Sequence, residues 1–394
     1  MRSLMVFFLS PFLSFPFFVN DVVNGHYKAI RIISLLIGFI AMLYIPTLNN
    51  DKSFYYYYYS VFGDLSITEF WEYISIYKTD YAFYVFIYAF AQFGIPLKFL
   101  FLIFAYLTVS IWFGIITSLI KTKAGFYGSI SFWVFLILFS FSPTGLFSGV
   151  RFYLAISLVL LAIVRFSLSG KRFWQSLAIV FFGSIIHFSC LLFIPYLFLL
   201  KYIGGNVKAL KVVFYLSFIF LLLPRDVLSK IIVVGGSSDV YNAKVDSYLS
   251  AEDYIENSKE IGNFNNYLKY FFKSLWIYLC IYYVMITRRQ HSLLFSALML
   301  SVVFSNLFIN SPTVYNRYLI LVLGLFISQL FYDYCNGRRN QFIRNSLLIL
   351  LMVNLFGNVF TLRQRFSESL LSWNALFLPT IVLGDDFEYN DIRD

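Results

Sequence analysis

Three ionisable side chains, Arg151, His187 and Arg317, lie within or at the start of strongly apolar segments. A charged side chain at the centre of a membrane-spanning helix costs about 2.5–3.5 kcal/mol on insertion scales, so each of them requires an explanation. Arginine forms bidentate hydrogen bonds with phosphate, and histidine takes up or releases a proton near neutral pH. Two arginines at one membrane face suggest a bound anion, most simply a lipid diphosphate, with the histidine available as a general base.

Small residues share a helical face with each of these side chains, and such residues let a second helix or a ligand approach closely. They are Ala155 and Ala162, Gly183 and Ser184, and Gly324 and Ser328. Structural roles are open at this point, because Arg151 could extend to the membrane interface and His187 could serve only as a hydrogen-bonding strut.

The composition indicates what kind of element carries these residues. Of 394 residues, 60% are hydrophobic, 22% are aromatic and only 13% are charged, about half the charged share of a soluble domain. The net charge of +10 comes from Lys and Arg clusters between apolar runs, which is the pattern of a membrane protein and not of a nucleic-acid-binding one. We therefore predict an all-α polytopic integral membrane protein with no nucleic-acid partner.

About 11–12 apolar segments are candidates for transmembrane helices, which satisfy their own backbone polar groups in lipid. The segments are residues 4–19, 29–47, 81–95, 97–119, 126–142, 147–166, 174–200, 212–223, 271–287, 292–310, 314–335 and 345–361. We treat residues 1–394 as one transmembrane domain. Two polar loops, residues 49–80 and 224–270, interrupt it and are candidates to fold over an active site.

Loop charges indicate sidedness, because Lys and Arg accumulate on the cytoplasmic side. The basic clusters are Lys121/Lys123, Lys171/Arg172, Lys201/Lys208/Lys211, Arg288/Arg289 and Arg338/Arg339/Arg344. Arg151, His187 and Arg317 then lie near the opposite face, provided that residues 174–200 form a broken hairpin and not one span. Counting back from Lys121 places residues 49–80 inside unless 81–95 is re-entrant, and the sequence leaves this open.

The first polar loop contains Asp51 and the tyrosine run 55–59. Tyrosine faces stack on sugar rings, and tyrosine is also common at membrane interfaces, so both interpretations are open. The three cysteines are far apart in apolar segments, which predicts packing and no metal site. The usual signatures of nucleotide hydrolysis, zinc proteolysis and serine hydrolysis do not occur in the sequence.

Several motifs together resemble a known family. The segments are Asp51-Lys52-Ser53-Phe54-Tyr55, Gly149-Val150-Arg151-Phe152-Tyr153-Leu154-Ala155, Ile186-His187-Phe188-Ser189 running on to Pro195, and Tyr315-Asn316-Arg317-Tyr318. They resemble the EpsG-like and Wzy-type polysaccharide (O-antigen) polymerases of bacteria, which commonly show Arg-Gln-x-x-Ala at a helix start, then a His-x-Ser segment and a later arginine. One departure is plain: Phe152 stands where glutamine usually follows the arginine.

The resemblance implies a glycosyltransferase of the bacterial inner membrane, with an all-helical fold similar to lipid-dependent (GT-C-like) glycosyltransferases. Its substrates would be oligosaccharide repeat units on undecaprenyl diphosphate, polymerised at the periplasmic face into O-antigen, capsule or exopolysaccharide. A cofactor, a nucleotide sugar or a metal is not expected. Membrane lipid, a flippase and a chain-length regulator are the expected partners.

Under this resemblance the site residues fall into three groups. The diphosphate-binding residues are Arg151 and Arg317, the candidate bases are His187 and Asp51, and the sugar contacts are Tyr55, Tyr153 and Asn316. Three rival functions stay open: a flippase or other transporter, a membrane-bound acyltransferase centred on His187, and a non-catalytic membrane subunit. The sequence does not define the sugars, the linkage or the oligomeric state.

Overall fold

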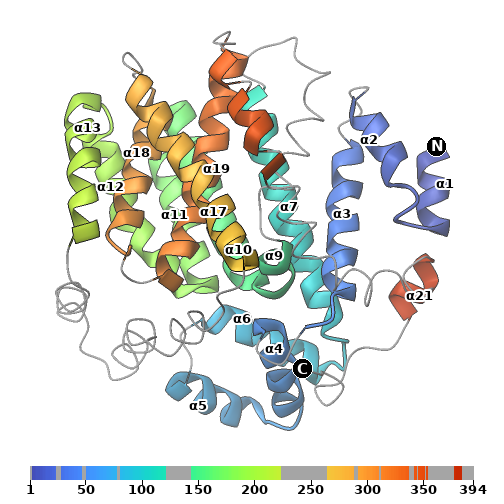
Figure 1. Ribbon diagram of the computed structural model, residues 1–394. Helices are drawn as coiled ribbons and strands as arrows, with labels where there is room; N and C mark the ends of the chain where they lie inside the picture. Colours follow the sequence, from blue (N-terminus) through green and yellow to red (C-terminus); the bar gives the residue numbers. More distant parts are fainter. Residues whose placement is uncertain are drawn as a thin grey trace. The chain divides into compact units, whose positions relative to one another are not determined.

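All regular secondary structure in the described part of the computed structural model is helical (Figure 1). The described residues are 2–23, 28–46, 50–77, 80–120, 143–222, 264–287, 292–309, 312–336, 341–343, 345–350, 352–353 and 377–383. The predicted all-α fold is confirmed for this part of the chain. The predicted span at 126–142, residues 354–361 of the last span and most of the predicted loop 224–270 lie outside it.

The chain divides into two compact units. The first comprises Met1–Leu161, Ala178–Leu191 and Phe331–Asp394, and the second comprises Ala162–Leu177 and Leu192–Leu330. The helices in chain order are α1 (Arg2–Leu9), α2 (Phe15–Val23), α3 (Lys28–Leu43), α4 (Asp51–Gly63), α5 (Ile67–Tyr77), α6 (Tyr81–Gln92), α7 (Lys98–Ile120), α9 (Pro143–Ser148), α10 (Val150–Ser169), α11 (Phe173–Ile186), η1 (Phe188–Leu192), α12 (Phe193–Ile203), α13 (Val207–Leu216), η2 (Ser217–Leu222), α17 (Phe264–Ile286), α18 (Leu293–Asn306), α19 (Pro312–Cys335) and α21 (Leu378–Leu383).

Three of the described helices are long and apolar enough, by length and composition, to cross a membrane. They are α7, α10 and α19, over Lys98–Leu119, Val150–Ser169 and Val314–Cys335. Other apolar stretches of helix among the described residues are shorter, at 10–17 residues, and one of them is the part Leu275–Ile286 of α17. The predicted span 4–19 is divided between α1 and α2. The chain is therefore a helical membrane protein, while the larger number of spans stays a prediction.

Helices α3 and α7 pack along each other in the first unit. A Cβ atom on Gly38 would lie 2.9 Å from the carbonyl oxygen of Leu102, closer than side chains normally approach backbone. Only glycine fits without a shift at this crossing. Because Gly38 is near the end of α3 and Leu102 is near the start of α7, these two helix ends lie side by side.

Lys52 is fully buried and joins α4 to the end of α3. Its Nζ donates hydrogen bonds to the carbonyl oxygens of Ala41 (2.9 Å), Met42 (3.3 Å) and Tyr44 (2.6 Å). It also lies 4.5 Å from the ring centre of Phe101 in α7. The last carbonyl groups of a helix have no partner within the helix, and a positive charge is favourable there. Lys52 therefore satisfies the end of α3 and fixes where α4 begins.

The loop predicted over residues 49–80 is replaced by α4 and α5, which occupy most of residues 50–77. Asn50 caps α4, and its side chain accepts the backbone N–H of Lys52 at 3.1 Å. At α5, the Glu69 carboxylate accepts the Ser66 backbone N–H at 2.8 Å, as in a capping box. Hydrogen bonds from Ser66 lower the pKa of Glu69 below its ordinary value. Asn50 and the Ser66–Glu69 pair are residue types that mark helix starts in a sequence. The polar composition of residues 49–80 indicated a loop instead.

Helix α6 is too short to cross a membrane. Its 12 residues span about 18 Å, well below the roughly 30 Å of a bilayer core. It runs beside α4: the rings of Tyr55 and Phe83 lie 4.7 Å apart near the two helix starts, and Gln92 donates to the Phe62 carbonyl at 3.0 Å near the two ends. The structure therefore has no helix of membrane-spanning length at residues 81–92, and the re-entrant alternative for residues 81–95 stays a prediction.

The stretch predicted at 174–200 is a broken hairpin, as the predicted sidedness requires. Helix α11 ends just before His187, and the chain passes through η1 into α12. At the start of α11, the ring of Phe173 lies 5.1 Å from that of Phe198 in the middle of α12 and 4.3 Å from Nζ of Lys201 near the end of α12. The two helices are therefore antiparallel, and the break falls at His187.

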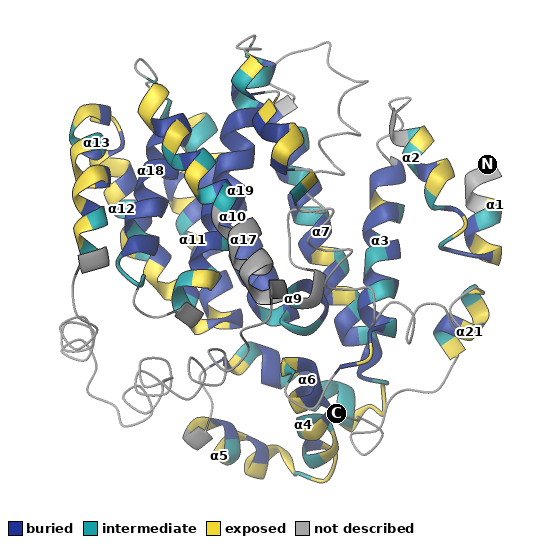
Figure 2. Ribbon diagram, in the orientation of Figure 1, coloured by how far each residue is buried: buried dark blue, intermediate teal, exposed yellow. Residues whose placement is uncertain are grey.

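Polar side chains link the helices of the second unit. The buried hydroxyl of Tyr196 in α12 donates to the carbonyl of Ala297 in α18 at 2.7 Å. Asn306 at the end of α18 donates to the hydroxyl of Ser217 at 2.9 Å. Helix α18 is buried along almost its whole length (Figure 2). Hydrogen bonds between helices thus hold this unit together, as expected for packing in lipid.

Replacing Lys52 with methionine preserves most of the side-chain length and removes the charge and all three hydrogen bonds to the end of α3. Because buried carbonyl groups lose their donor, we expect the free energy of unfolding to fall by about 2–4 kcal/mol. The measurement is the thermal unfolding midpoint of the purified protein in detergent. Lys208→Met, at an exposed position of α13, is the matched control and should leave the midpoint unchanged. An unaltered midpoint for Lys52→Met would contradict the role given to this lysine.

Candidate functional site

Arg151 lies in the first turn of α10, just after the glycine that joins α9 to α10. That residue, Gly149, is also the point where α4 comes close. A Cβ atom at Gly149 would lie 3.1 Å from the Gly145 carbonyl oxygen and 3.8 Å from Oδ2 of Asp51. The start of α10 therefore brings a guanidinium and a carboxylate from α4 into one neighbourhood.

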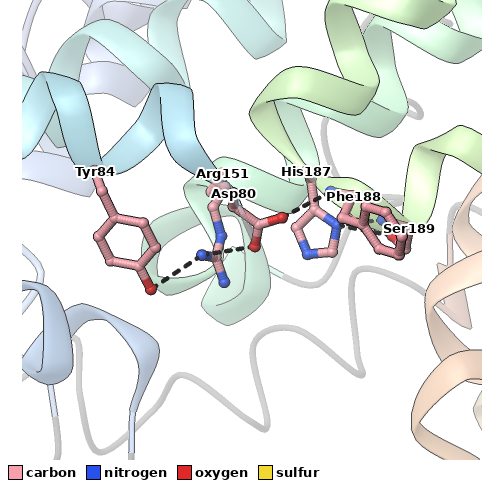
Figure 3. Close-up of polar contacts among 6 residues, drawn as sticks. All are labelled: Asp80, Tyr84, Arg151, His187, Phe188 and Ser189. Carbon is pink, nitrogen blue, oxygen red and sulfur yellow. Dashed lines mark hydrogen bonds and ion pairs between the residues drawn. The ribbon is translucent and has the colours of Figure 1, made fainter. Parts of the chain in front are cut away.

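One terminal nitrogen of Arg151 is held by polar contacts from the α6 region. Nη1 forms an ion pair with Oδ2 of Asp80 at 2.9 Å and donates to the hydroxyl of Tyr84 at 3.4 Å (Figure 3). The Asp80 side chain is 5% exposed and the Arg151 side chain is 15% exposed. Nε of Arg151 is buried and has no hydrogen-bond partner in the described part of the chain.

Aromatic rings enclose the same guanidinium. Its Cζ lies 5.6 Å from the ring centre of Tyr55, 5.7 Å from that of Phe83 and 5.8 Å from that of Tyr84. Arginine stacks on aromatic faces and is more weakly hydrated than lysine, so it tolerates such a partly dry environment. Low local polarity also strengthens any ion pair that the guanidinium makes.

Asp80 connects Arg151 to the break between α11 and α12. While Oδ2 faces Arg151, Oδ1 accepts the backbone N–H of Phe188 at 2.7 Å (Figure 3). Asp80 is the N-cap residue of α6, but its side chain makes no capping hydrogen bond to that helix. Aspartate is a favoured N-cap residue. The Asp80 side chain instead contacts Arg151 and Phe188, which are distant in sequence, and makes no capping hydrogen bond to α6.

His187 is buried at the break, and its protonation pattern is constrained by its neighbour Ser189. Nδ1 lies 2.8 Å from the Ser189 hydroxyl and 3.3 Å from the Ser189 backbone nitrogen. A backbone N–H can only donate, so Nδ1 accepts it and the neutral ring carries its proton on Nε2. Phe152, the residue that departs from the family motif, packs edge-on against the imidazole with ring centres 5.2 Å apart.

Asp51 and Tyr55 share one face of α4, because they are four residues apart. Asp51 is exposed, whereas Tyr55 is buried, and its hydroxyl has no hydrogen-bond partner among the described residues. Burial raises the pKa of Tyr55 above its ordinary value, although the charge of Arg151 opposes this, so the hydroxyl is protonated at neutral pH. The structure therefore brings the predicted residues Asp51, Tyr55, Arg151 and His187 into one unit around one guanidinium.

The other predicted residues have different surroundings. The ring of Tyr153 is buried against Gly145 of α9, where a Cβ atom would collide with it, so protein covers this ring. Asn316 is exposed and Arg317 is half-buried, and both belong to α19 in the second unit. The pairing of Arg151 with Arg317 on one diphosphate stays a prediction.

Asp80, Phe83 and Tyr84 were not predicted as site residues from the sequence. The available signal was an aspartate directly before an apolar stretch, and that pattern is typical of an ordinary helix cap. Aromatic residues in an apolar helix are equally unremarkable by themselves. Their importance depends on contact with Arg151, which is distant in sequence.

This arrangement is suited to holding an anionic oxygen. Nε of Arg151 and the hydroxyl of Tyr55 are buried donors without acceptors in the described residues, and each such group costs about 1–3 kcal/mol. Arginine guanidinium groups pair with phosphate oxygens. The first unit thus brings a cation, two unsatisfied donors and the carboxylates of Asp51 and Asp80 into one neighbourhood.

Comparison with known proteins gives one family. The family model described as the EpsG family matches residues 27–370, which include every predicted site residue. No curated protein and no solved structure matches the chain.

Tyr55→Phe removes a hydroxyl that has no partner in the described protein while leaving the ring beside Arg151. We expect an unfolding midpoint in detergent equal to or slightly above that of the unaltered protein, because deleting an unsatisfied buried polar group is neutral or stabilising. Thermal unfolding of the two proteins side by side provides the measurement. A clear fall in midpoint would mean that the hydroxyl has a structural partner.

Proposed function

The chain belongs to the EpsG family, and on that premise we propose that it polymerises oligosaccharide repeat units carried on undecaprenyl diphosphate. Family membership supports a polysaccharide polymerase-like role. The observation that carries the finer proposal is the Arg151 guanidinium, which is enclosed by aromatic rings and uses only Nη1 in its contacts with Asp80 and Tyr84. The products would be O-antigen, capsule or exopolysaccharide.

The reaction transfers the growing chain to the incoming repeat unit. An acceptor hydroxyl attacks the anomeric carbon of the chain, a new glycosidic C–O bond forms, and the C–O bond to the lipid diphosphate breaks. The hydroxyl proton passes to a base, and the electron pair leaves with the diphosphate. Arg151 would stabilise the developing negative charge, and the surrounding rings would exclude water that could hydrolyse the donor.

We assign the base to Asp51 and a donor role to His187. Asp51 is an exposed carboxylate near the start of α10, so an acceptor hydroxyl can reach it. His187 accepts hydrogen bonds at Nδ1 and so presents Nε2–H, which suits contact with an anionic or hydroxyl oxygen better than proton abstraction. The same pattern disfavours an acyltransferase in which His187 is the general base.

The periplasmic face is the proposed side of the reaction. The starts of α7 and α10 lie together, since Tyr55 contacts both Phe101 and Arg151. Each helix is followed by a basic cluster, Lys121/Lys123 after α7 and Lys171/Arg172 after α10. The positive-inside rule assigns those clusters to the cytoplasm and hence the Arg151 end to the opposite face. A flippase that delivers the lipid-linked unit and a chain-length regulator are the partners that such a reaction needs.

Arg151→Ala should abolish chain extension, and Arg151→Lys should slow it at least about 10-fold, since an ammonium cannot reproduce bidentate pairing with phosphate. The assay is a reaction of purified protein in detergent with the native lipid-diphosphate-linked repeat unit, read as a ladder on a gel. Arg165→Ala, at an exposed position of the same helix, is the control and should extend chains normally. Normal ladders from correctly folded Arg151→Ala protein would overturn the proposed function.

Asp51→Asn tests the assignment of the base. Removing a general base lowers turnover by about 10²–10⁴-fold, and the loss should appear in kcat with a smaller change in KM. Asp64→Asn is a matched control at the other end of α4, where the carboxylate is exposed. If Asp51→Asn retains its turnover while His187→Ala loses it, the two roles must be exchanged.

A further inference from the structure

We propose that Asp80 is a positioning residue that holds the Arg151 guanidinium and the α11–α12 break in one fixed arrangement. The inference rests on the proposed function for its effect on chain extension, but the hold itself is a property of the folded chain. Asp80 belongs to no motif that the sequence resemblance carries.

The first support is that both carboxylate oxygens of Asp80 are committed to different segments. Oδ2 lies 2.9 Å from Nη1 of Arg151, and Oδ1 lies 2.7 Å from the backbone nitrogen of Phe188. Neither oxygen caps α6, the helix that Asp80 precedes. A missing cap costs about 1 kcal/mol, so the geometry favours the tertiary contacts over local stability.

The second support is the backbone group that Asp80 satisfies. His187 still donates to the carbonyl of Gly183 at 2.9 Å, as in a helix, but the N–H of Phe188 turns to Asp80 instead of continuing the helical pattern. Cys190 then donates to the carbonyl of His187 at 3.0 Å and starts the next turn. In an apolar environment a freed N–H is costly, so an acceptor at this point stabilises the break.

The third support is the orientation that Asp80 gives to Arg151. The contacts of Nη1 with Asp80 and Tyr84 restrict the orientation of the guanidinium (Figure 3). Asp80 also balances the charge in a partly dry pocket, where an uncompensated guanidinium would be strongly destabilised. The Asp80 carboxylate thus determines both the orientation of the Arg151 guanidinium and the backbone conformation next to His187.

The consequence is a coupling between two parts of the proposed site. The turn held by Phe188 carries His187 and Ser189, and the ion pair carries Arg151. Without the Asp80 carboxylate, the Arg151 guanidinium and the turn that carries the His187 imidazole are no longer held by the same side chain. A displacement of about 1 Å at reacting groups costs on the order of 100-fold in rate, which sets the scale of the expected effect.

Two substitutions separate the two contacts. Asp80→Asn keeps an oxygen for the Phe188 N–H and removes the charge facing Arg151, whereas Asp80→Ala removes both. We expect Asp80→Asn to lower kcat for chain extension about 10-fold and Asp80→Ala about 100-fold, with KM changing less. Glu72→Gln, at an exposed position of α5, is the control and should match the unaltered protein.

Hydrogen–deuterium exchange of the purified proteins supplies the readout that does not depend on activity. In Asp80→Ala the peptide covering residues 187–192 should lose more protection than the other helices of the same variant, whereas in Asp80→Asn it should change no more than they do. Unchanged exchange in Asp80→Ala, a loss of protection in that variant that is no greater at residues 187–192 than elsewhere, or normal kcat in both variants would overturn the inference. Absence of a ladder from the unaltered protein would instead count against the proposed function, and exchange would still decide whether Asp80 holds the break.

Discussion

A backbone break inside an apolar segment must give partners to the polar groups that it frees, and this constraint shapes the first unit. At the end of α11 the N–H of Phe188 leaves the helical pattern and is accepted by Asp80. Because Asp80 is charged and buried, it in turn requires a cation, and Arg151 provides it at 2.9 Å. The break in the helix therefore requires the Asp80 carboxylate, and the buried carboxylate in turn requires the Arg151 guanidinium.

A second buried charged residue, Lys52, supplies hydrogen-bond donors at the end of another helix. Lys52 donates to three carbonyl oxygens around the end of α3, where donors are missing, just as Asp80 accepts an N–H where an acceptor is missing. Both residues lie at starts of short helices, α4 and α6, that are not long enough to cross a bilayer. These short helices supply the polar groups that the ends of longer apolar helices lack.

The surroundings of Arg151 explain how a structural ion pair can leave capacity for a ligand. Asp80 and Tyr84 share Nη1, while the rings of Tyr55, Phe83 and Tyr84 restrict access of water to the cation. A guanidinium has five N–H donors, so one occupied nitrogen leaves others for an anionic group. Compensation by Asp80 makes burial of the guanidinium tolerable, and the proposed contact with a lipid diphosphate would use the remaining donors.

The sequence by itself determined the helical membrane class, the family resemblance and the candidates Asp51, Arg151 and His187, because composition and short motifs are local properties of the chain. The stretch 49–80 was predicted as a loop, and the helix starts at Asn50 and Ser66 were recognised only in the structure. Only the tertiary structure decided that Asp80 joins Arg151 to Phe188, that protein covers the ring of Tyr153, and that the hairpin breaks at His187. The physical reason is that the partner of a buried charge depends on which distant helix ends meet, and no local pattern encodes that meeting.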